Sequence, residues 1–317
     1  MPPSTVTFER AEWVHKAEIY LGFMCGAIYG RMMTGLAPVL REATAALEGI
    51  SPTPRLDAEL LLAHALGIDR SAMLLRQHDL SVPDGYSGLL ARRVADEPVA
   101  YITGVQAFWD LELCVTPDVL IPRADSESLL QAAIDWFGEN NAPMRIADLG
   151  TGSGALLLAA LSIFPNAKAM GIDSSAKALA VASDNANRAK FADRVQFELR
   201  DWTKAGWADG LGQFDLILCN PPYVEDGFML APMVAAYEPH SALFAGADGL
   251  NDYRILVPSL RALLNSRGVA FFEIGYNQAQ AVHKLGAEEG FLTELHDDLA
   301  GNPRAIRFSL GNAEYWG

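Results

Sequence analysis

A short turn that carries a side-chain amide and an aromatic ring is the first stretch whose residues could take part in chemistry. Asn220, Pro221, Pro222 and Tyr223 follow the apolar run of residues 214–219. That run has the length and aliphatic content of a buried parallel strand, and the two prolines prevent both further strand pairing and an immediate helix. Asn220 should therefore end a central strand at the carboxyl edge of a sheet, where open α/β sheets bind ligands. We predict that these four residues bind a planar amino or amide group.

A glycine-rich turn lies further upstream in the chain. Asp148 and Leu149 are followed by Gly150, Thr151, Gly152, Ser153 and Gly154. Glycines at alternate positions let the backbone turn sharply and approach a ligand without a Cβ in the way. The spacing differs from the G-x-G-x-x-G of a dinucleotide site, which makes NAD the less favoured ligand. Asp148 alone would also suit a simple turn cap.

Polar residues also end the next two predicted strands. Asp173 is placed to accept both hydroxyls of a ribose. Asp201 is placed to accept an adenine amino group, and Trp202 to cover the adenine face, although an indole at this position would also suit the core. Together with residues 148–154, these strand ends supply methionine, ribose and adenine contacts in order. The series predicts S-adenosylmethionine as cofactor, bound by residues 148, 150–154, 173, 201, 202 and 220.

Strand-like and helix-like segments alternate around these residues. Strands are expected at 145–149, 168–172, 194–199, 214–219, 268–274, 290–295 and 305–310, and helices at 155–163, 175–188, 251–265 and 277–289. Such alternation predicts an α/β fold with a mostly parallel sheet covered on both faces, and the last two strands suit an antiparallel hairpin. With the predicted cofactor, residues 126–317 form a Rossmann-like class I methyltransferase domain with seven strands.

The preceding part of the chain has a different pattern. Apolar residues at helical spacing predict helices at 38–47, 56–66, 70–76 and 84–96, hence a small helical bundle at 36–98 that we expect to dock the substrate. Residues 99–125 alternate and carry glycine and proline, which predicts a hairpin connector with strand-like stretches at 99–104, 106–115 and 119–122. A helix then begins near Glu127, with Asp125 or Ser126 as N-cap. Phe108 and Trp109 fit either the core or the wall of a substrate pocket.

Composition limits the classes of function. The formal net charge of −15 argues against a protein that binds nucleic acid by neutralising many phosphates. The three cysteines are far apart, which indicates neither a disulfide framework nor a zinc site and favours a cytoplasmic protein without a metal. Residues 19–30 are apolar but too few to span a bilayer, and acidic residues before them disfavour a signal peptide. Residues 1–35 are expected to be an amphipathic or disordered extension, or to precede a true start at Met32 or Met33.

At this point the sequence resembles the HemK/PrmC family, which methylates the glutamine of the Gly-Gly-Gln motif in class I peptide chain release factors. The resemblance runs from residue 36 to 310 and rests on residues 55–61, 98–104, 120–123, 148–154, 220–224, 238–243, 248–254, 273–275 and 298–301. The Asn-Pro-Pro-Tyr turn alone is shared with nucleic-acid amino methyltransferases. Its combination with the helical region and the Ile-Pro-Arg connector is specific to the family.

The resemblance implies an S-adenosylmethionine-dependent glutamine methyltransferase. Asn220, Pro221 and Tyr223 would be catalytic, and Pro222 and Phe108 would also contact the substrate. The family usually has Pro-Arg-Pro-(Asp/Glu)-Thr-Glu where this chain has Pro122 followed by residues 123–127, Arg-Ala-Asp-Ser-Glu. Ser126 keeps a hydroxyl and Glu127 keeps the acid, so activity is expected to survive. A monomer that does not bind nucleic acid or membrane directly is expected.

Three alternatives are open on sequence grounds. A sister family methylates a glutamine of a ribosomal protein, but its connector typically continues Pro-Arg-Ser-Pro, unlike Asp125-Ser126-Glu127 here. A DNA or RNA amino methyltransferase would grip a flipped base with the same turn, but predicts a basic face or a recognition domain. A non-catalytic binding module would not need an intact glycine turn, Asp173 and the Asn-Pro-Pro-Tyr turn together.

Overall fold

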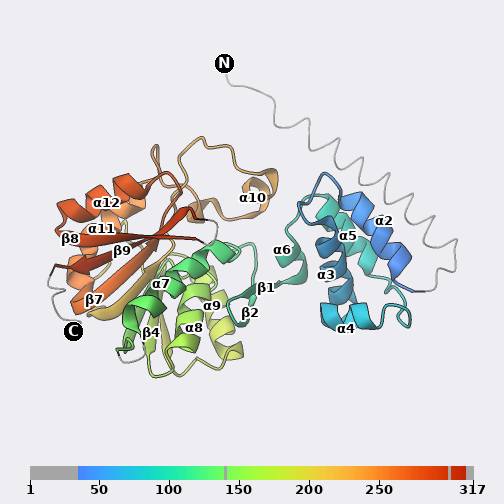
Figure 1. Ribbon diagram of the computed structural model, residues 1–317, viewed down its shortest axis with the longest axis horizontal. Helices are drawn as coiled ribbons and strands as arrows, with labels where there is room; N and C mark the ends of the chain where they lie inside the picture. The colour runs from blue at the N-terminus through green and yellow to red at the C-terminus, as the bar shows by residue number, and fades with distance from the viewer. Residues whose placement is uncertain (1–34, 139–140, 299–300, 312–317) are drawn as a thin grey trace, which may run out of the picture. The chain divides into compact units, whose positions relative to one another are not determined.

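The computed structural model describes residues 35–138, 141–298 and 301–311 (Figure 1). The chain separates into two compact units. One consists of residues up to Gly104 together with Pro232–Tyr237, and the other consists of Val105–Ala231 and the residues from Glu238 onward. The extension predicted for residues 1–35 lies outside the described residues, except for Gly35.

The first unit is helical. It contains α2 (Ala37–Leu47), α3 (Pro54–Leu66), α4 (Arg70–Leu75), α5 (Tyr86–Val94), α6 (Val99–Thr103) and the short α10 (Pro232–Tyr237). Proline occupies the first turn of α2 and of α3, where its missing N–H costs nothing, and Gly67 ends α3 in the left-handed conformation. The apolar faces of α2, α3 and α5 meet in a core that includes Leu40, Leu61 and Leu90. The predicted helical bundle is therefore present in the structure.

The strand-like stretch expected at residues 99–104 is wrong, because Val99–Thr103 forms helix α6. Valine, tyrosine and isoleucine favour strands only when a pleated surface is available for packing. Here Ala100, Tyr101 and Ile102 are buried in the helical unit, and Gly104 ends the helix with a φ of +75°. Tertiary burial thus outweighs the local preference, and the connector begins at Val105 rather than at residue 99. Residues 119–122 are likewise not a strand.

The second unit is built on a seven-stranded sheet. Its strands are β3 (Arg145–Leu149), β4 (Lys168–Asp173), β5 (Val195–Leu199), β6 (Phe214–Cys219), β7 (Leu264–Glu273), β8 (Phe291–Asp297) and β9 (Pro303–Leu310). The order is β5-β4-β3-β6-β7-β9-β8, and all neighbouring strands are parallel except that β9 is antiparallel to β7 and to β8. A separate hairpin of β1 (Val105–Phe108) and β2 (Leu111–Cys114) precedes it. The predicted α/β fold, mostly parallel sheet and final antiparallel pair are confirmed.

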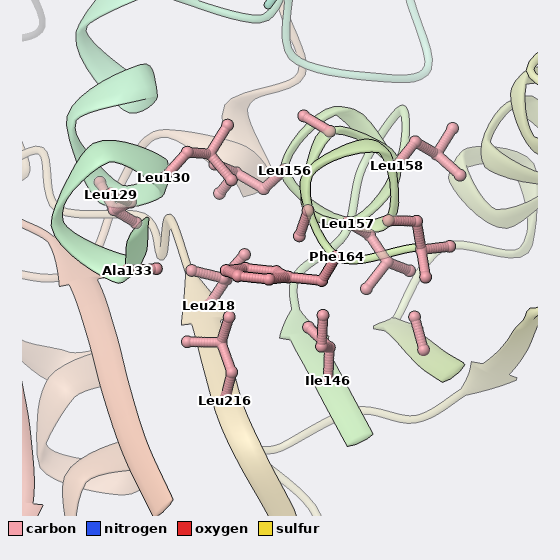
Figure 2. Close-up of a cluster of buried hydrophobic side chains, with 14 of the residues drawn as sticks. Leu129, Leu130, Ala133, Ile146, Leu156, Leu157, Leu158, Phe164, Leu216 and Leu218 are labelled. Carbon is pink, nitrogen blue, oxygen red and sulfur yellow. The ribbon is translucent and has the colours of Figure 1, made fainter. Parts of the chain in front are cut away.

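Helices cover both faces of this sheet. One face carries α7 (Glu127–Phe137), α8 (Ala155–Ile163) and α9 (Ala176–Arg188), and the other carries α11 (Asn251–Leu263) and α12 (Ala279–Glu288). Figure 2 shows the first of these layers, in which leucines from α7 and α8 surround the Phe164 ring above the strands. The central strand β6 is buried on both sides from Leu216 to Cys219, which explains why these four residues are apolar without alternation.

The topology determines where ligands can bind. The chain leaves β3 toward β4 and β5 on one side, whereas β6 and β7 lie on the other side of β3. The connections after β3 and after β6 therefore diverge, and such a switch point forms a crevice at the carboxyl ends of parallel strands. Asp148 near the end of β3 is paired in register with Leu218 of β6, two residues before Asn220. The glycine-rich turn and the Asn-Pro-Pro-Tyr turn are consequently neighbours.

Candidate active site

A cavity of about 330 Å³ lies at this switch point. Its wall includes most of the residues predicted to bind cofactor or substrate, namely Phe108, Asp148, Gly150, Thr151, Gly152, Ser153, Asp173, Trp202, Asn220 and Pro222. Gly154, Asp201, Pro221 and Tyr223 do not line it. The structure thus brings together residues from four strand ends and from the β1–β2 hairpin, which are separated by up to 114 positions in the chain (222 − 108 = 114).

Asp148 is the most deeply buried acid of this cavity. Only 1 % of its surface is exposed, and its Oδ2 accepts a hydrogen bond of 2.8 Å from the Thr151 hydroxyl. Its Oδ1 is buried and accepts no hydrogen bond within the described parts of the chain. Burial raises the pKa of Asp148 to about 7, and the Asp173 carboxylate contributes in the same direction. A buried carboxylate with an open oxygen is suited to a cationic or hydrogen-bond-donating ligand.

The glycine turn has the backbone that only glycine adopts readily. Gly150, Gly152 and Gly154 have φ values of +78°, +55° and +83°, and helix α8 begins directly afterwards. A Cβ on Gly150 would lie 3.1 Å from Cη2 of Trp202, so the indole packs directly on this turn. Gly154 is not part of the wall because it faces Leu158 and Ala182 of the neighbouring helices. Its role is close packing between α8 and α9.

Asp173 joins the turn to the end of β4. Its Oδ2 accepts from the Gly152 backbone N–H at 2.9 Å, and its Oδ1 accepts from the Ser175 N–H at the same distance. Burial raises the pKa of Asp173, and these backbone N–H groups partly offset that effect. Each carboxylate oxygen has a second lone pair, so the group retains the capacity to accept ligand hydroxyls.

Trp202 and Asp201 have different environments although they are adjacent. The Trp202 indole N–H donates to Oδ1 of Asp252, in the first turn of α11, at 2.6 Å, which fixes the ring at the cavity wall. Asp201 is half-buried, and its Oδ1 accepts from the backbone N–H and the hydroxyl of Thr203. These bonds lower the pKa of Asp201. Of the two, the structure brings only Trp202 into the cavity, and Asp201 serves as a turn cap.

The Asn-Pro-Pro-Tyr turn is tied to a buried acid of β7. The Nδ2 of Asn220 donates to the Ser126 hydroxyl at 3.2 Å, and that hydroxyl donates in turn to Oε2 of Glu273. The Tyr223 hydroxyl donates to the other oxygen, Oε1, at 3.1 Å. Burial raises the pKa of Glu273, whereas its two hydrogen-bond donors and the charge of Arg304 oppose this shift. Burial likewise raises the pKa of Tyr223, so its hydroxyl remains a donor.

Two loops complete the wall. Arg123 forms an ion pair with Glu238, whose side chain is completely buried and also accepts from the Ile121 N–H at 3.4 Å. This pair attaches residues 119–123 to the loop of residues 239–242, and both segments line the cavity. Phe108 is 2 % exposed and contacts the apolar core as well as the cavity, so both interpretations of its position hold.

Several residues of this site were missed at the level of sequence. Ser126 was predicted as a helix N-cap, and it occupies that position in α7 without capping it, because its hydroxyl is directed to Glu273. Glu273 had a detectable signal, since an acid that ends an apolar strand is costly to bury without a purpose. Asp252, which holds Trp202, Arg304, whose charge acts on Glu273, and the loop at 239–242, which lines the cavity, gave no comparable signal, because only the tertiary fold brings them to these partners.

Comparison with known proteins matches this architecture. A family model described as PrmC N-terminal domain matches residues 38–104, and one described as Methyltransferase domain matches residues 140–270. A release factor glutamine methyltransferase of Rhodospirillum rubrum is 40 % identical over 259 residues, covering 80 % of this chain and 78 % of that protein. Proteins of the same name from Caulobacter vibrioides and Burkholderia pseudomallei are 37 % and 39 % identical, covering 80 % and 83 % of this chain and 88 % and 95 % of theirs.

The sheet order, the glycine turn and the methyltransferase match define a class I S-adenosylmethionine-dependent methyltransferase. The solved catalytic domain of hMettl16, in complex with an RNA hairpin of the MAT2A 3′UTR, shares the fold with a TM-score of 0.52 and 13 % identity, over 71 % of this chain and 82 % of that one. That likeness concerns the fold alone. Given its curated relatives, the chain belongs to the release factor glutamine methyltransferase family.

Within residues 35–138, 141–298 and 301–311, no helix is both long enough and apolar enough to cross a bilayer.

Proposed function

We propose that the protein transfers a methyl group from S-adenosylmethionine to the side-chain amide nitrogen of the glutamine in the Gly-Gly-Gln motif of class I peptide chain release factors. The observation that carries this proposal is that the Asn-Pro-Pro-Tyr turn and the glycine-rich turn meet at one cavity. The chain is also 40 % identical to an enzyme named for that reaction. The helical unit is proposed to dock the release factor, because residues 38–104 match the N-terminal domain of the same family.

The cavity fits the cofactor chemically. S-adenosylmethionine, when bound, supplies a methyl group that is already activated on a sulfonium. Asp173 is suited to accept its ribose hydroxyls, and the fixed Trp202 ring is suited to cover an apolar or aromatic face. The unpartnered Oδ1 of Asp148 suits the positively charged methionine part, and the glycine turn leaves room for close backbone approach. Asp201 would contribute only from the rim, since it does not line the cavity.

The protein's task is to position and desolvate the substrate amide. An amide nitrogen is a poor nucleophile because its lone pair is delocalised into the carbonyl. We infer that Asn220 Oδ1 and the Pro221 carbonyl accept the two N–H bonds, which raises the electron density on nitrogen and fixes its direction. Pro221 and Tyr223 lie outside the cavity wall but alternate in sequence with Asn220 and Pro222, which line it. From there Tyr223, anchored by Glu273, would stack on the amide plane and exclude water, while Pro222 and Phe108 bound the pocket. The amide proton would leave late, after transfer.

A parallel transfer assay tests this proposal. Purified class I release factor, a ribosomal protein preparation and total RNA are each incubated with the enzyme and tritiated S-adenosylmethionine. The proposal expects label in the release factor and none in the other two substrates. Label in ribosomal protein or RNA, with an unlabelled release factor, would replace it with one of the alternative methyltransferase functions. A monomeric state, a cytoplasmic location and the absence of nucleic-acid binding are further predictions of the same proposal.

A further inference from the structure

One buried carboxylate contacts both functional side chains of the Asn-Pro-Pro-Tyr turn, either directly or through one hydroxyl. Glu273 is 1 % exposed and Ser126 is 4 % exposed, so no bulk water competes for these contacts. Tyr223 donates to one oxygen of Glu273 and Ser126 donates to the other. The Glu273 backbone is itself fixed, because its carbonyl accepts from the Tyr253 hydroxyl at 2.7 Å and its strand pairs with β9 at Ala305.

The direction of the hydrogen bonds follows from proton counting. A serine hydroxyl has one proton to donate, whereas an ionised carboxylate can only accept. Burial raises the pKa of Glu273, but its two oxygens each accept a hydroxyl proton here, one from Tyr223 and one from Ser126, which is the bonding pattern of a carboxylate that only accepts. Ser126 must therefore use its proton on Glu273 and can offer only a lone pair to Asn220. The amide atom that faces Ser126 must be the donor Nδ2, as the 3.2 Å contact has it.

This arrangement determines which amide atom remains for a ligand. Asn220 lines the cavity, and its Oδ1 accepts no hydrogen bond from any described residue. If the Asn220 amide were flipped, its N–H₂ group would face the N–H₂ group of the substrate amide. Two donors would then face each other, and no hydrogen bond could form between them. The orientation that Ser126 selects is the one that can accept a hydrogen bond from a substrate amide.

Ser126 does not cap the helix that follows it. It is the last residue of a 3-10 turn (Ala124–Ser126) that runs directly into α7, and its φ of −66° and ψ of −17° are already helical. A residue with this backbone is not placed to cap the helix, because capping residues have a non-helical backbone. The hydroxyl is instead directed toward Glu273 and Asn220.

We propose that Glu273 is a positioning residue that orients Tyr223 directly and Asn220 through the Ser126 hydroxyl, so that Asn220 presents its oxygen to the substrate. The inference rests on the proposed function, since it assumes that the substrate group is an amide with N–H bonds to donate. It assigns no contact with substrate to Ser126 or Glu273 themselves.

A double-mutant cycle tests whether Ser126 acts through Asn220. Ser126→Ala should lower kcat about 10- to 100-fold, the usual loss when a group that orients a reacting ligand is removed, with unchanged cofactor affinity. In an Asn220→Ala background the same substitution should change kcat little, because the amide that Ser126 orients is no longer present. Ser126→Thr keeps the hydroxyl and should keep the activity. Ser128→Ala, on the same helix with its hydroxyl on a backbone carbonyl, is the matched control. Equal losses from Ser126→Ala in both backgrounds would overturn the proposal.

A measurement without substrate separates this inference from the proposed function. The side-chain amide resonance of Asn220 in the ¹⁵N–¹H spectrum is identified by its absence in Asn220→Ala. It should shift in Ser126→Ala and in the isosteric Glu273→Gln, but not in Ser128→Ala. An unmoved resonance in the first two variants would overturn the relay even if release factor is methylated. If the wild-type enzyme labels no release factor, the proposed function fails and this spectrum alone decides the relay.

Discussion

At the scale of the residue, the site depends on polar atoms that are open toward the cavity. Asn220 is the central case, because its Nδ2 is engaged by Ser126 while Oδ1 accepts no bond from the described residues. Asp148 is the second case, with a buried Oδ1 that has no partner. A buried acceptor without a partner costs free energy, and a ligand that donates a hydrogen bond to it removes that cost.

The first prediction concerns Asn220→Ala. The substitution should slow methyl transfer by roughly 10²-fold or more, the loss typical of one hydrogen bond that stabilises a transition state, and it should leave cofactor affinity nearly unchanged. Single-turnover rates and calorimetric titration with S-adenosylmethionine measure the two quantities. Asn141→Ala, at an exposed position, serves as control. An unchanged kcat with release factor would remove Asn220 from the chemistry.

The second prediction is a pH dependence of cofactor affinity. Burial raises the pKa of Asp148 from 3.8 to about 7, so in the free protein this carboxyl is largely protonated below pH 7 and ionised above it. A positively charged ligand binds the ionised form, so affinity for S-adenosylmethionine should rise as pH increases from 5.5 to about 7. Asp148→Asn should flatten this rise, and the raised pKa of Asp173 accounts for any residual slope. The same slope in wild type and variant would exclude Asp148 as its origin.

The position of the strand-end residues was largely predictable from sequence, because a residue that ends a buried parallel strand must lie at the carboxyl edge of the sheet. Asp148, Asp173, Trp202 and Asn220 were found in this way, and all four line the cavity. Ser126 was interpreted as a helix cap because local rules describe only the backbone next to it. Its actual partner, Glu273, is 147 positions away in the chain, and no local pattern indicates such a contact.

At the scale of the element, the site is formed by the turn between β3 and α8 and by the ring that packs on it. Gly150 has a φ of +78°, and Trp202 leaves no room for a side chain there. The indole is fixed by Asp252 of α11, on the opposite face of the sheet from α8. The cavity therefore depends on contacts from both helical layers.

The third prediction compares two glycines with the same backbone conformation. Gly150→Ala and Gly210→Ala both place a side chain at a φ of +78°, and each should cost about 1–2 kcal/mol of stability. Only at Gly150 would the new methyl group meet a ring, whereas nothing lies within 4 Å of Gly210. Gly150→Ala should in addition weaken cofactor binding by about 1–3 kcal/mol. Thermal unfolding and calorimetry measure both effects, and equal cofactor affinity in the two variants would contradict the assigned role of the turn.

Elements with a single consistent signal were predicted well. The bounds of β3, β6 and α8 agree with the sequence pattern, because each is mostly apolar and has clear glycine or proline limits. The stretch at 99–103 was wrong because its β-branched and aromatic residues are buried against other helices rather than in a sheet. The short α10 was not predicted, since six residues carry too little periodicity to distinguish a helix from a loop.

At the scale of the whole molecule, the chain combines a helical unit with a catalytic unit and carries a net charge of −15. Each unit has its own apolar core. Among the described residues of the helical unit, none lines the cavity. Recognition of the protein substrate is the contribution that we propose.

The fourth prediction tests that contribution. Leu75 of α4 is 85 % exposed, so Leu75→Glu should not disturb folding. If this helix belongs to the docking surface, the change should weaken release factor binding by roughly 1 kcal/mol or more, a loss that only the energetically important minority of interface residues gives. It should leave kcat/KM for a short Gly-Gly-Gln peptide unaltered. Leu292→Glu, at an exposed position on β8, is the control. Equal KM values for release factor in both variants would remove α4 from the docking surface.

The central claim is that this site methylates a glutamine side chain, and the position of the methyl group tests it most directly. Purified release factor is treated with the enzyme and S-adenosylmethionine, digested, and analysed by tandem mass spectrometry. The account predicts one added methyl group on the side-chain nitrogen of the glutamine in the Gly-Gly-Gln motif, present with wild type and strongly reduced with Asn220→Ala. Methylation at any other residue, or an equal yield with Asn220→Ala, would contradict it.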